Sequence, residues 1–188
     1  MPADLTRLER TLNTFLAKQD HHSFVSLLRA QRLAREVPAQ LDRRVCDAVF
    51  LAAQSSDWRL AAEAIDEFRD IVGALKRTAD VLARGLLSKY KSVRIASWGA
   101  ILCRRYGLRL SRMVLSRLEA KPTAELMVWE VLMAVDQMAD YLTSERDRKR
   151  LVQFVKRLEA HGTRSYLVEW KIEETLYSDL HLNQPRDQ

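Results

Sequence analysis

Glycine and proline are scarce in this chain, whose 188 residues include five Gly and four Pro. Folds built from many short strands need these residues at their tight turns, so the scarcity argues against a turn-rich β fold. Apolar residues recur instead at intervals of three and four, and no stretch shows sustained alternation of apolar and polar side chains. This pattern predicts an all-α chain in which long helices are joined by short loops.

Cysteine is rarer still. Cys46 and Cys103 have no partner at CxxC spacing, so we interpret both as buried free thiols. The N-terminus is charged and has no apolar signal region. No uncharged run approaches the roughly 20 residues that a membrane span needs. We therefore expect a cytoplasmic protein that makes no membrane contact.

Motifs for catalysis, nucleotide binding and metal binding are also missing. The chain has no GxxxxGK[ST], GxGxxG, HExxH or GxSxG, and its four histidines show no recurring spacing. We therefore expect no catalytic residue, no metal and no small-molecule cofactor. No feature of the sequence indicates an oligomeric state.

The most informative absence is that of acidic residues between positions 81 and 118. This window contains nine Lys and Arg and no Asp or Glu, whereas the whole chain has a net charge of +6. The remainder of the chain is therefore slightly acidic. Positive charge that is concentrated on one part of a folded surface attracts polyanions and acidic protein segments. We expect the contact surface of the protein to lie in this window.

Apolar periodicity and capping signals predict about ten helices. Ser56 or Asp57 suits an N-cap, as does Thr78, and Ser144 with Asp147 forms a capping box. The predicted helices cover residues 4–18, 23–36, 38–54, 56–73, 78–88, 92–106, 110–120, 123–142, 144–161 and 163–180.

A shift of 35 positions aligns residues 57–62 (DWRLAA) with residues 92–97 (SVRIAS). Both segments place an Arg between apolar residues and follow it with small side chains. Small residues let two helices approach closely, and a period in the thirties indicates stacked helical hairpins. The pattern resembles the second helix of a HEAT repeat, which begins with a Val-Arg pair followed by small residues. The resemblance is limited to these two segments.

This resemblance implies a right-handed stack of about five antiparallel helical hairpins, a HEAT-like α-α superhelix. We expect a single domain over 1–182 and a polar tail at 183–188. The recurring Arg of HEAT repeats ties neighbouring repeats together, so Arg59 and Arg94 are interpreted first as structural, and Trp58 as an apolar plug. A globular helical bundle with one repeat-like hairpin is the alternative architecture.

A basic stripe is predicted along the helix at 92–106 and the start of the next helix. At about 100° per residue, its cations share one side of the helix with a tryptophan. Alternatively, the tryptophan belongs to the core and the cations pair with acidic residues elsewhere. The predicted partner-binding residues are Lys91, Arg94, Trp98, Arg105, Arg109 and Arg112.

Three functions fit this stripe. The preferred one is a non-catalytic binding or adaptor module that docks an acidic protein segment, because helical repeats commonly serve as protein scaffolds. The first alternative is sequence-independent binding of a nucleic-acid backbone, with bases packed on aromatic rings. The second is a DNA-processing enzyme, because HEAT-like alkylpurine DNA glycosylases combine a basic groove with Trp and an acidic residue. Glu130 and Asp136 are the candidate acids here.

Overall fold

The computed structural model describes residues 2–33, 43–67, 75–101, 107–126 and 129–160, and the helix predicted over 163–180 lies outside them. All regular secondary structure in these ranges is helical, which confirms the all-α class. The helices are α1 (Pro2–Ala17), α2 (His21–Leu33), α3 (Arg43–Ala52), α4 (Trp58–Asp66), α5 (Leu75–Leu86), α6 (Lys91–Ile101), α7 (Gly107–Glu119), α8 (Thr123–Leu126), α9 (Trp129–Ala139) and α10 (Glu145–Ala160).

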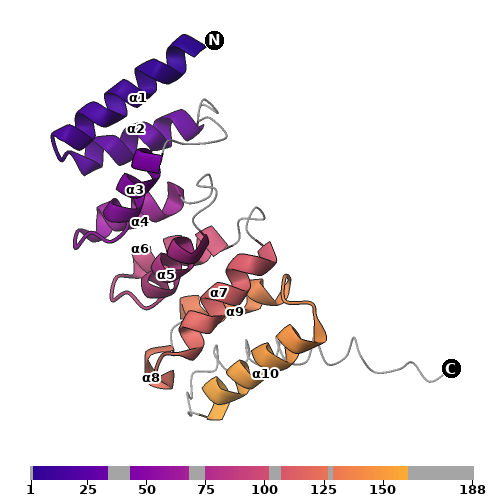
Figure 1. Cartoon of the computed structure of the whole chain (residues 1–188). Coiled ribbons are helices and arrows are strands. Elements are labelled where there is room, and N and C mark those ends of the chain that lie inside the picture. The colour runs from indigo at the N-terminus through magenta and orange to yellow at the C-terminus, as the bar shows by residue number, and fades with distance from the viewer. Residues whose placement is uncertain (1, 34–42, 68–74, 102–106, 127–128, 161–188) are drawn as a thin grey trace.

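The helices form two rows that run from the N-terminal to the C-terminal end of an elongated molecule (Figure 1). Consecutive helices pair with each other, α1 with α2, α3 with α4 and α5 with α6. Contacts between alternate helices build one row from α1, α3, α5, α7 and α10, and a second row from α2, α4, α6 and α9. This two-row order fits the stacked hairpins expected from the repeat, while the right-handed superhelical sense stays a prediction.

The core consists of the apolar stripes that the two rows turn toward each other. Phe24, Phe50, Ile65, Leu82 and Leu115 are all less than 2% exposed. These residues come from helices in both rows, so one continuous core runs along the described stack. Each hairpin therefore depends on its neighbours to cover its apolar surface.

The structure tests three predicted helix starts. Asp57 is the N-cap of α4, and its side chain accepts a hydrogen bond from the backbone N–H of Arg59. The backbone N–H of Asp147 donates to the hydroxyl of Ser144, so the cap predicted for α10 is also confirmed. Thr78 was wrongly predicted as a cap, because α5 begins at Leu75 and Thr78 is only 1% exposed. The helix predicted over 123–142 is described as α8 and α9, on either side of 127–128.

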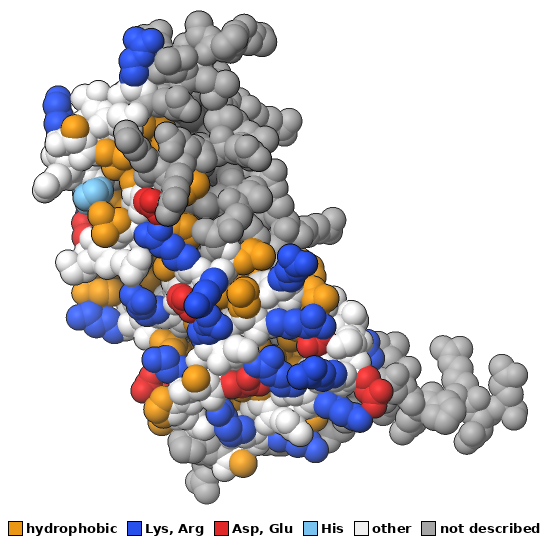
Figure 2. Space-filling model, in the orientation of Figure 1, with side chains coloured by type: hydrophobic (Ala, Val, Ile, Leu, Met, Phe, Trp, Pro, Cys, Tyr) orange, Lys and Arg blue, Asp and Glu red, His pale blue; other side chains and the backbone are white. Residues whose placement is uncertain are grey.

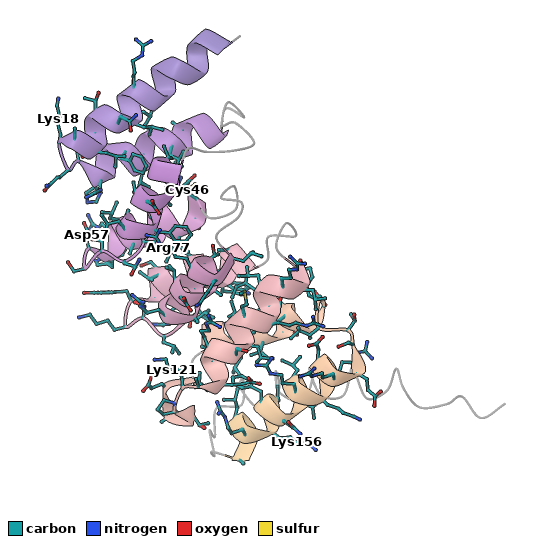
Figure 3. All side chains as sticks on the ribbon, viewed as in Figure 1. Lys18, Cys46, Asp57, Arg77, Lys121 and Lys156 are labelled. Carbon is teal, nitrogen blue, oxygen red and sulfur yellow. The ribbon has the colours of Figure 1, made fainter. Side chains whose placement is uncertain are left out.

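The turns that join paired helices lie along one edge of the stack. Lys18 follows α1, Asp57 precedes α4 and Lys121 follows α7, and Figure 3 places all three on the same side of the molecule. In Figure 1 the turn between α5 and α6 lies between the turn that joins α3 to α4 and the turn that joins α7 to α8. Residues at consecutive turns are therefore neighbours in space although they are about 30 positions apart in the sequence.

Gly85 marks a close approach of α5 to α6. A Cβ atom at this position would lie 2.0 Å from Ser97 Oγ and 3.1 Å from Ser97 Cβ. Ser97 Oγ donates to the carbonyl oxygen of Val93 at 2.8 Å, so it cannot turn away without losing this bond. We expect Gly85→Ala to lower the free energy of unfolding by about 1–3 kcal/mol through overpacking, although alanine favours helix.

Urea denaturation of four proteins tests this expectation: the wild type, Gly85→Ala, Ser97→Ala and the double variant. Removing the Ser97 hydroxyl should relieve most of the clash, so the two substitutions should be less than additive. A Gly85→Ala protein more stable than the wild type would contradict the close approach.

Candidate partner-binding site at the hairpin turns

Arginine–carboxylate pairs connect neighbouring hairpins along the row of α3, α5, α7 and α10. Arg77 of α5 pairs with Asp47 of α3. Arg117 of α7 then pairs with Asp80 of α5 at 2.7 Å. The members of each pair are 30 and 37 positions apart, close to the repeat period. Figure 2 shows the result on the visible face, where acidic side chains lie among the cations. Part of the positive charge of the described residues is therefore matched by carboxylates on the neighbouring hairpin.

Arg94 also forms an arginine–carboxylate pair between helices and does not belong to an exposed basic stripe. Its guanidinium donates to the Glu130 carboxylate from Nε at 3.0 Å and from Nη2 at 3.4 Å. The Arg94 side chain is 16% exposed and that of Glu130 is 4% exposed. Nη1 also donates to the carbonyl oxygens of Ser88 and Lys89, at 3.0 and 3.3 Å. Arg94 thus joins α6 to α9 and holds the turn between α5 and α6.

Arg112 is also bound by a carboxylate. It donates to Asp147 through Nε at 2.9 Å and through Nη2 at 2.6 Å, a bidentate arrangement that links α7 to α10. The Asp147 side chain is 7% exposed, whereas that of Arg112 is 45% exposed. The hydroxyl of Ser144 also donates to Asp147, at 2.5 Å. The Asp147 carboxylate therefore stabilises the start of α10 and also links α10 to α7.

Titration of Asp147 should make stability depend on pH. The hydrogen bonds from Arg112 and then from Ser144 lower the pKa of Asp147 below its ordinary value. A carboxyl group whose pKa falls on folding stabilises the folded state above its unfolded pKa of about 3.9. This stabilisation is lost as the pH falls through the folded pKa. We expect Asp147→Asn to be less stable than the wild type at neutral pH and the difference to close below about pH 4.

Urea denaturation of both proteins between neutral and acidic pH measures this difference. Glu145→Gln is the control, because Glu145 also forms an ion pair on α10 but is 82% exposed. A difference between Asp147→Asn and the wild type that stays constant over this range would contradict the assigned role.

The remaining predicted residues that the structure describes are Lys91, Trp98 and Arg109, and they do not form one exposed stripe. Lys91 is at the start of α6 and Arg109 is in the first turn of α7, and Figure 1 shows the start of α7 on the opposite side of the stack from the turn between α5 and α6. Both are exposed, and neither forms an ion pair with a carboxylate of the described residues. Trp98 is partly buried and packs against the core. Arg105 lies outside the described residues.

A different site is formed by the turns between α3 and α4 and between α5 and α6. These turns and the adjoining helix ends line an open pocket of about 440 Å³, which we call the turn pocket. Its lining includes the buried residues Ala53, Ala61, Val81 and Val93. The floor of the turn pocket is therefore apolar.

Aromatic rings and cations surround this floor. Trp58 and Tyr90 stack with their ring centroids 6.1 Å apart, and they are 37% and 36% exposed. Lys89 lines the turn pocket and lies 5.0 Å from the centroid of the Tyr90 ring. Arg59 does not line the pocket but lies beside it, 5.2 Å from the centroid of the Trp58 ring. Arg84 is exposed and lines the turn pocket as well. None of these three cations pairs with a carboxylate of the described residues.

Local hydrogen bonds fix the aromatic residues at the turns. Asp57 caps α4 immediately before Trp58, and His22 Nε2 contacts the Asp57 carboxylate at 2.9 Å. The backbone N–H of Arg59 contributes most to lowering the pKa of Asp57, so this carboxylate is charged at neutral pH. On the other turn, the hydroxyl oxygen of Ser88 accepts a hydrogen bond from the backbone N–H of Tyr90 at 3.2 Å. Local hydrogen bonds thus fix the backbone at the start of α4, where Trp58 lies, and in the turn before α6, where Tyr90 lies.

Sequence reasoning did not give Trp58 a binding role. It interpreted this residue as an apolar plug because Trp58 aligns with Val93 in the repeat, and Val93 is in fact buried at 6% exposure. The difference in size was the available signal, because a tryptophan cannot fill a space that a valine fills. Tyr90, in a Lys-Tyr-Lys turn, offered a second signal.

The described residues contain no group of three or more His, Cys, Asp or Glu side chains that could hold a metal ion. None of the described helices combines the length and the apolar character that a bilayer span requires. No family model, curated protein or solved structure matches the chain. The likeness to HEAT repeats therefore stays a prediction from the two aligned segments.

Proposed function

We propose that the protein is a non-catalytic helical-repeat binding module that docks an acidic segment of a partner protein at the turn pocket. One observation carries the proposal. Of the cations in the 81–118 window, Arg94, Arg112 and Arg117 are bound by carboxylates. Arg84 and Lys89, which have no such partner among the described residues, meet at the turn pocket beside two exposed aromatic rings.

Unmatched cations at a solvent-exposed rim favour carboxylates as partners. Arg84 donates to the neutral side-chain oxygen of Gln54 at 3.1 Å, which leaves its positive charge unbalanced. Lys91 adds another exposed cation at the start of α6. Tryptophan, tyrosine and arginine are the residues most enriched among those that dominate protein–protein binding energy. The composition of the rim thus supports a protein partner.

Nucleic-acid binding is supported less well by the same geometry. A nucleic-acid backbone gains affinity from a track of phosphate contacts. Within the 81–118 window, the unmatched cations Arg84 and Lys89 instead lie at one pair of turns, whereas Arg109 is in the first turn of α7. Carboxylates also lie among the cations on the face shown in Figure 2. The binding experiment must therefore distinguish a nucleic-acid ligand from an acidic peptide.

The enzymatic alternative finds little support at Glu130. This carboxylate is 4% exposed and is bound by Arg94, which keeps it away from a substrate on the surface. A DNA glycosylase needs an acidic group that reaches an extruded base in its pocket. Neither Glu130 nor Asp136 lines the turn pocket.

Fluorescence anisotropy with labelled probes tests the proposal on the full chain. The probes are a 15-residue peptide rich in Asp and Glu that contains Leu and Phe, the same peptide with Lys at its acidic positions, and duplex and single-stranded DNA. We expect saturable binding of the acidic peptide that weakens moderately with salt, and no binding of the lysine peptide. DNA binding whose log affinity falls with log salt at a slope of about −4.5 would indicate five phosphate contacts and would favour the alternative. Failure of the acidic peptide to bind would refute the proposal.

A further inference from the structure

Building on the proposed function, we infer that the turn pocket recognises a specific short pattern: one bulky apolar side chain flanked on both sides by carboxylates. The apolar side chain enters the pocket, and the flanking acidic residues bind the cations at its rim. The site thereby distinguishes an acidic-apolar segment from an acidic segment without a large apolar residue.

The hollow shape of the site is the first argument. Binding of an acidic segment by charge alone requires exposed cations and no hollow, yet these turns line an open pocket of about 440 Å³. This volume lies within the range of pockets that bury most of a small ligand. The pocket contacts Ala53, Ala61, Val81 and Val93, each 7% exposed or less, whose side chains have no hydrogen-bonding group. Water in contact with such a floor is readily displaced by an apolar group.

The order of side chains around the pocket is the second argument. The stacked rings of Trp58 and Tyr90 bridge the start of α4 and the turn before α6. Arg59 lies against the Trp58 ring and Lys89 lies against the Tyr90 ring. The four residues therefore form a row of cation, ring, ring and cation across two neighbouring hairpins, in which Trp58, Tyr90 and Lys89 line the pocket and Arg59 lies beside it. A peptide laid across this row would place an apolar residue near the rings and its acidic neighbours near the cations at either end.

Polar groups at the rim can form hydrogen bonds with the backbone of such a peptide. Ser55, Ser56 and Ser88 line the turn pocket together with the amide of Gln54. Ser88 already accepts the backbone N–H of Tyr90 and Gln54 already accepts from Arg84, so the second lone pairs and the hydroxyl protons are the groups available to a ligand. These groups provide contacts that do not depend on the sequence of the bound segment.

A series of 11-residue peptides with equal length and equal net charge tests the inference. Each carries three acidic residues on both sides of a central position that holds Leu, Phe, Ala or Ser. We expect the Leu and Phe peptides to bind wild-type protein about 10- to 100-fold more tightly than the Ser peptide, because an apolar side chain is withdrawn from water. The comparison uses the wild-type chain, so it does not depend on whether any variant folds.

Variants then locate the preference. Trp58→Ala with Tyr90→Ala should abolish the advantage of the Leu and Phe peptides. Trp129→Ala is the matched control, because Trp129 is 38% exposed and does not line the turn pocket. Equal affinity of wild-type protein for all four peptides would overturn the inference and leave the proposed function intact. Failure of every peptide to bind would refute both, and a preference that survives in the Trp58→Ala, Tyr90→Ala protein would overturn the assignment to this pocket.

Discussion

Reversing the two unmatched cations at the turn pocket, Arg84→Glu with Lys89→Glu, should weaken binding of an acidic peptide by about 30-fold or more. The double substitution removes two attractive contacts and introduces two like charges beside the carboxylates of the ligand, and such juxtapositions strongly disfavour association. Fold stability should change little, because both side chains are exposed. Arg84 donates a hydrogen bond to Gln54 and Lys89 contacts the ring of Tyr90, so neither side chain links the helices through an ion pair with a described carboxylate.

Arg10→Glu with Lys156→Glu is the matched control for this experiment. It replaces one arginine and one lysine with glutamate, so the net charge changes by the same amount. Both residues are exposed, and they belong to α1 and α10 at opposite ends of the stack (Figure 1). We expect this variant to keep most of the wild-type affinity at physiological salt, where charges more than about 8 Å apart are largely screened. Equal losses in the two variants would show that the peptide responds to net charge and not to this site.

Breaking the Arg94–Glu130 pair should cause the largest loss of stability among the substitutions considered. Arg94→Met would leave the Glu130 carboxylate, now 4% exposed, without its cation. Removing one partner of a buried ion pair typically costs about 3–5 kcal/mol, because an uncompensated charge stays in a poorly hydrated place. Urea denaturation at neutral pH measures this loss.

The double variant Arg94→Met, Glu130→Leu separates the cost of an unpaired charge from the value of the pair itself. Replacing both partners with apolar residues of similar size is often nearly neutral, so most of the lost stability should return. Recovery should be incomplete, because the carbonyl oxygens of Ser88 and Lys89 also lose the Arg94 donor. If Arg94→Met alone lowered the free energy of unfolding by less than about 1 kcal/mol, the pair would behave as a solvent-exposed one.

Arg94 also bears on binding, although it is not a contact residue of the turn pocket. By holding the carbonyl oxygens of Ser88 and Lys89, it fixes the turn that presents Lys89 and Tyr90. Arg94→Met should therefore weaken peptide binding even at temperatures at which the variant is fully folded. The sequence suggested two roles for Arg94, first a structural link between repeats and second a partner contact. Its bonds to Glu130 agree with the structural role.

The helices and their ends were largely accessible from the sequence because they depend on local signals. Apolar residues at intervals of three and four place the buried faces, and the N-caps at Asp57 and Ser144 act on atoms within three residues. Thr78 failed as a cap because its hydroxyl suits a helix start in isolation, yet α5 already extends one turn before it. We attribute the start of α5 at Leu75 to packing against neighbouring hairpins, which the local sequence does not indicate.

The site was harder to predict, because its electrostatics depend on partners about one repeat away. Arg94 and Glu130 are 36 positions apart, and Arg112 and Asp147 are 35 apart. A helical projection of a single helix shows which cations share a side, but it does not show the carboxylates that the next hairpin brings to them. Comparing each cation with residues one period away would have indicated which charges are matched. The turn pocket likewise joins two turns that are separate in the sequence.

Acidic segments are proposed to bind at the turns between α3 and α4 and between α5 and α6. Two-dimensional ¹H–¹⁵N NMR of the full chain, titrated with the acidic Leu peptide, measures this location directly. We expect the largest chemical-shift changes at residues 53–59 and 84–93, including the Trp58 indole N–H. Changes centred on α7 around Arg109 and Arg112, with none at these two turns, would contradict the claim.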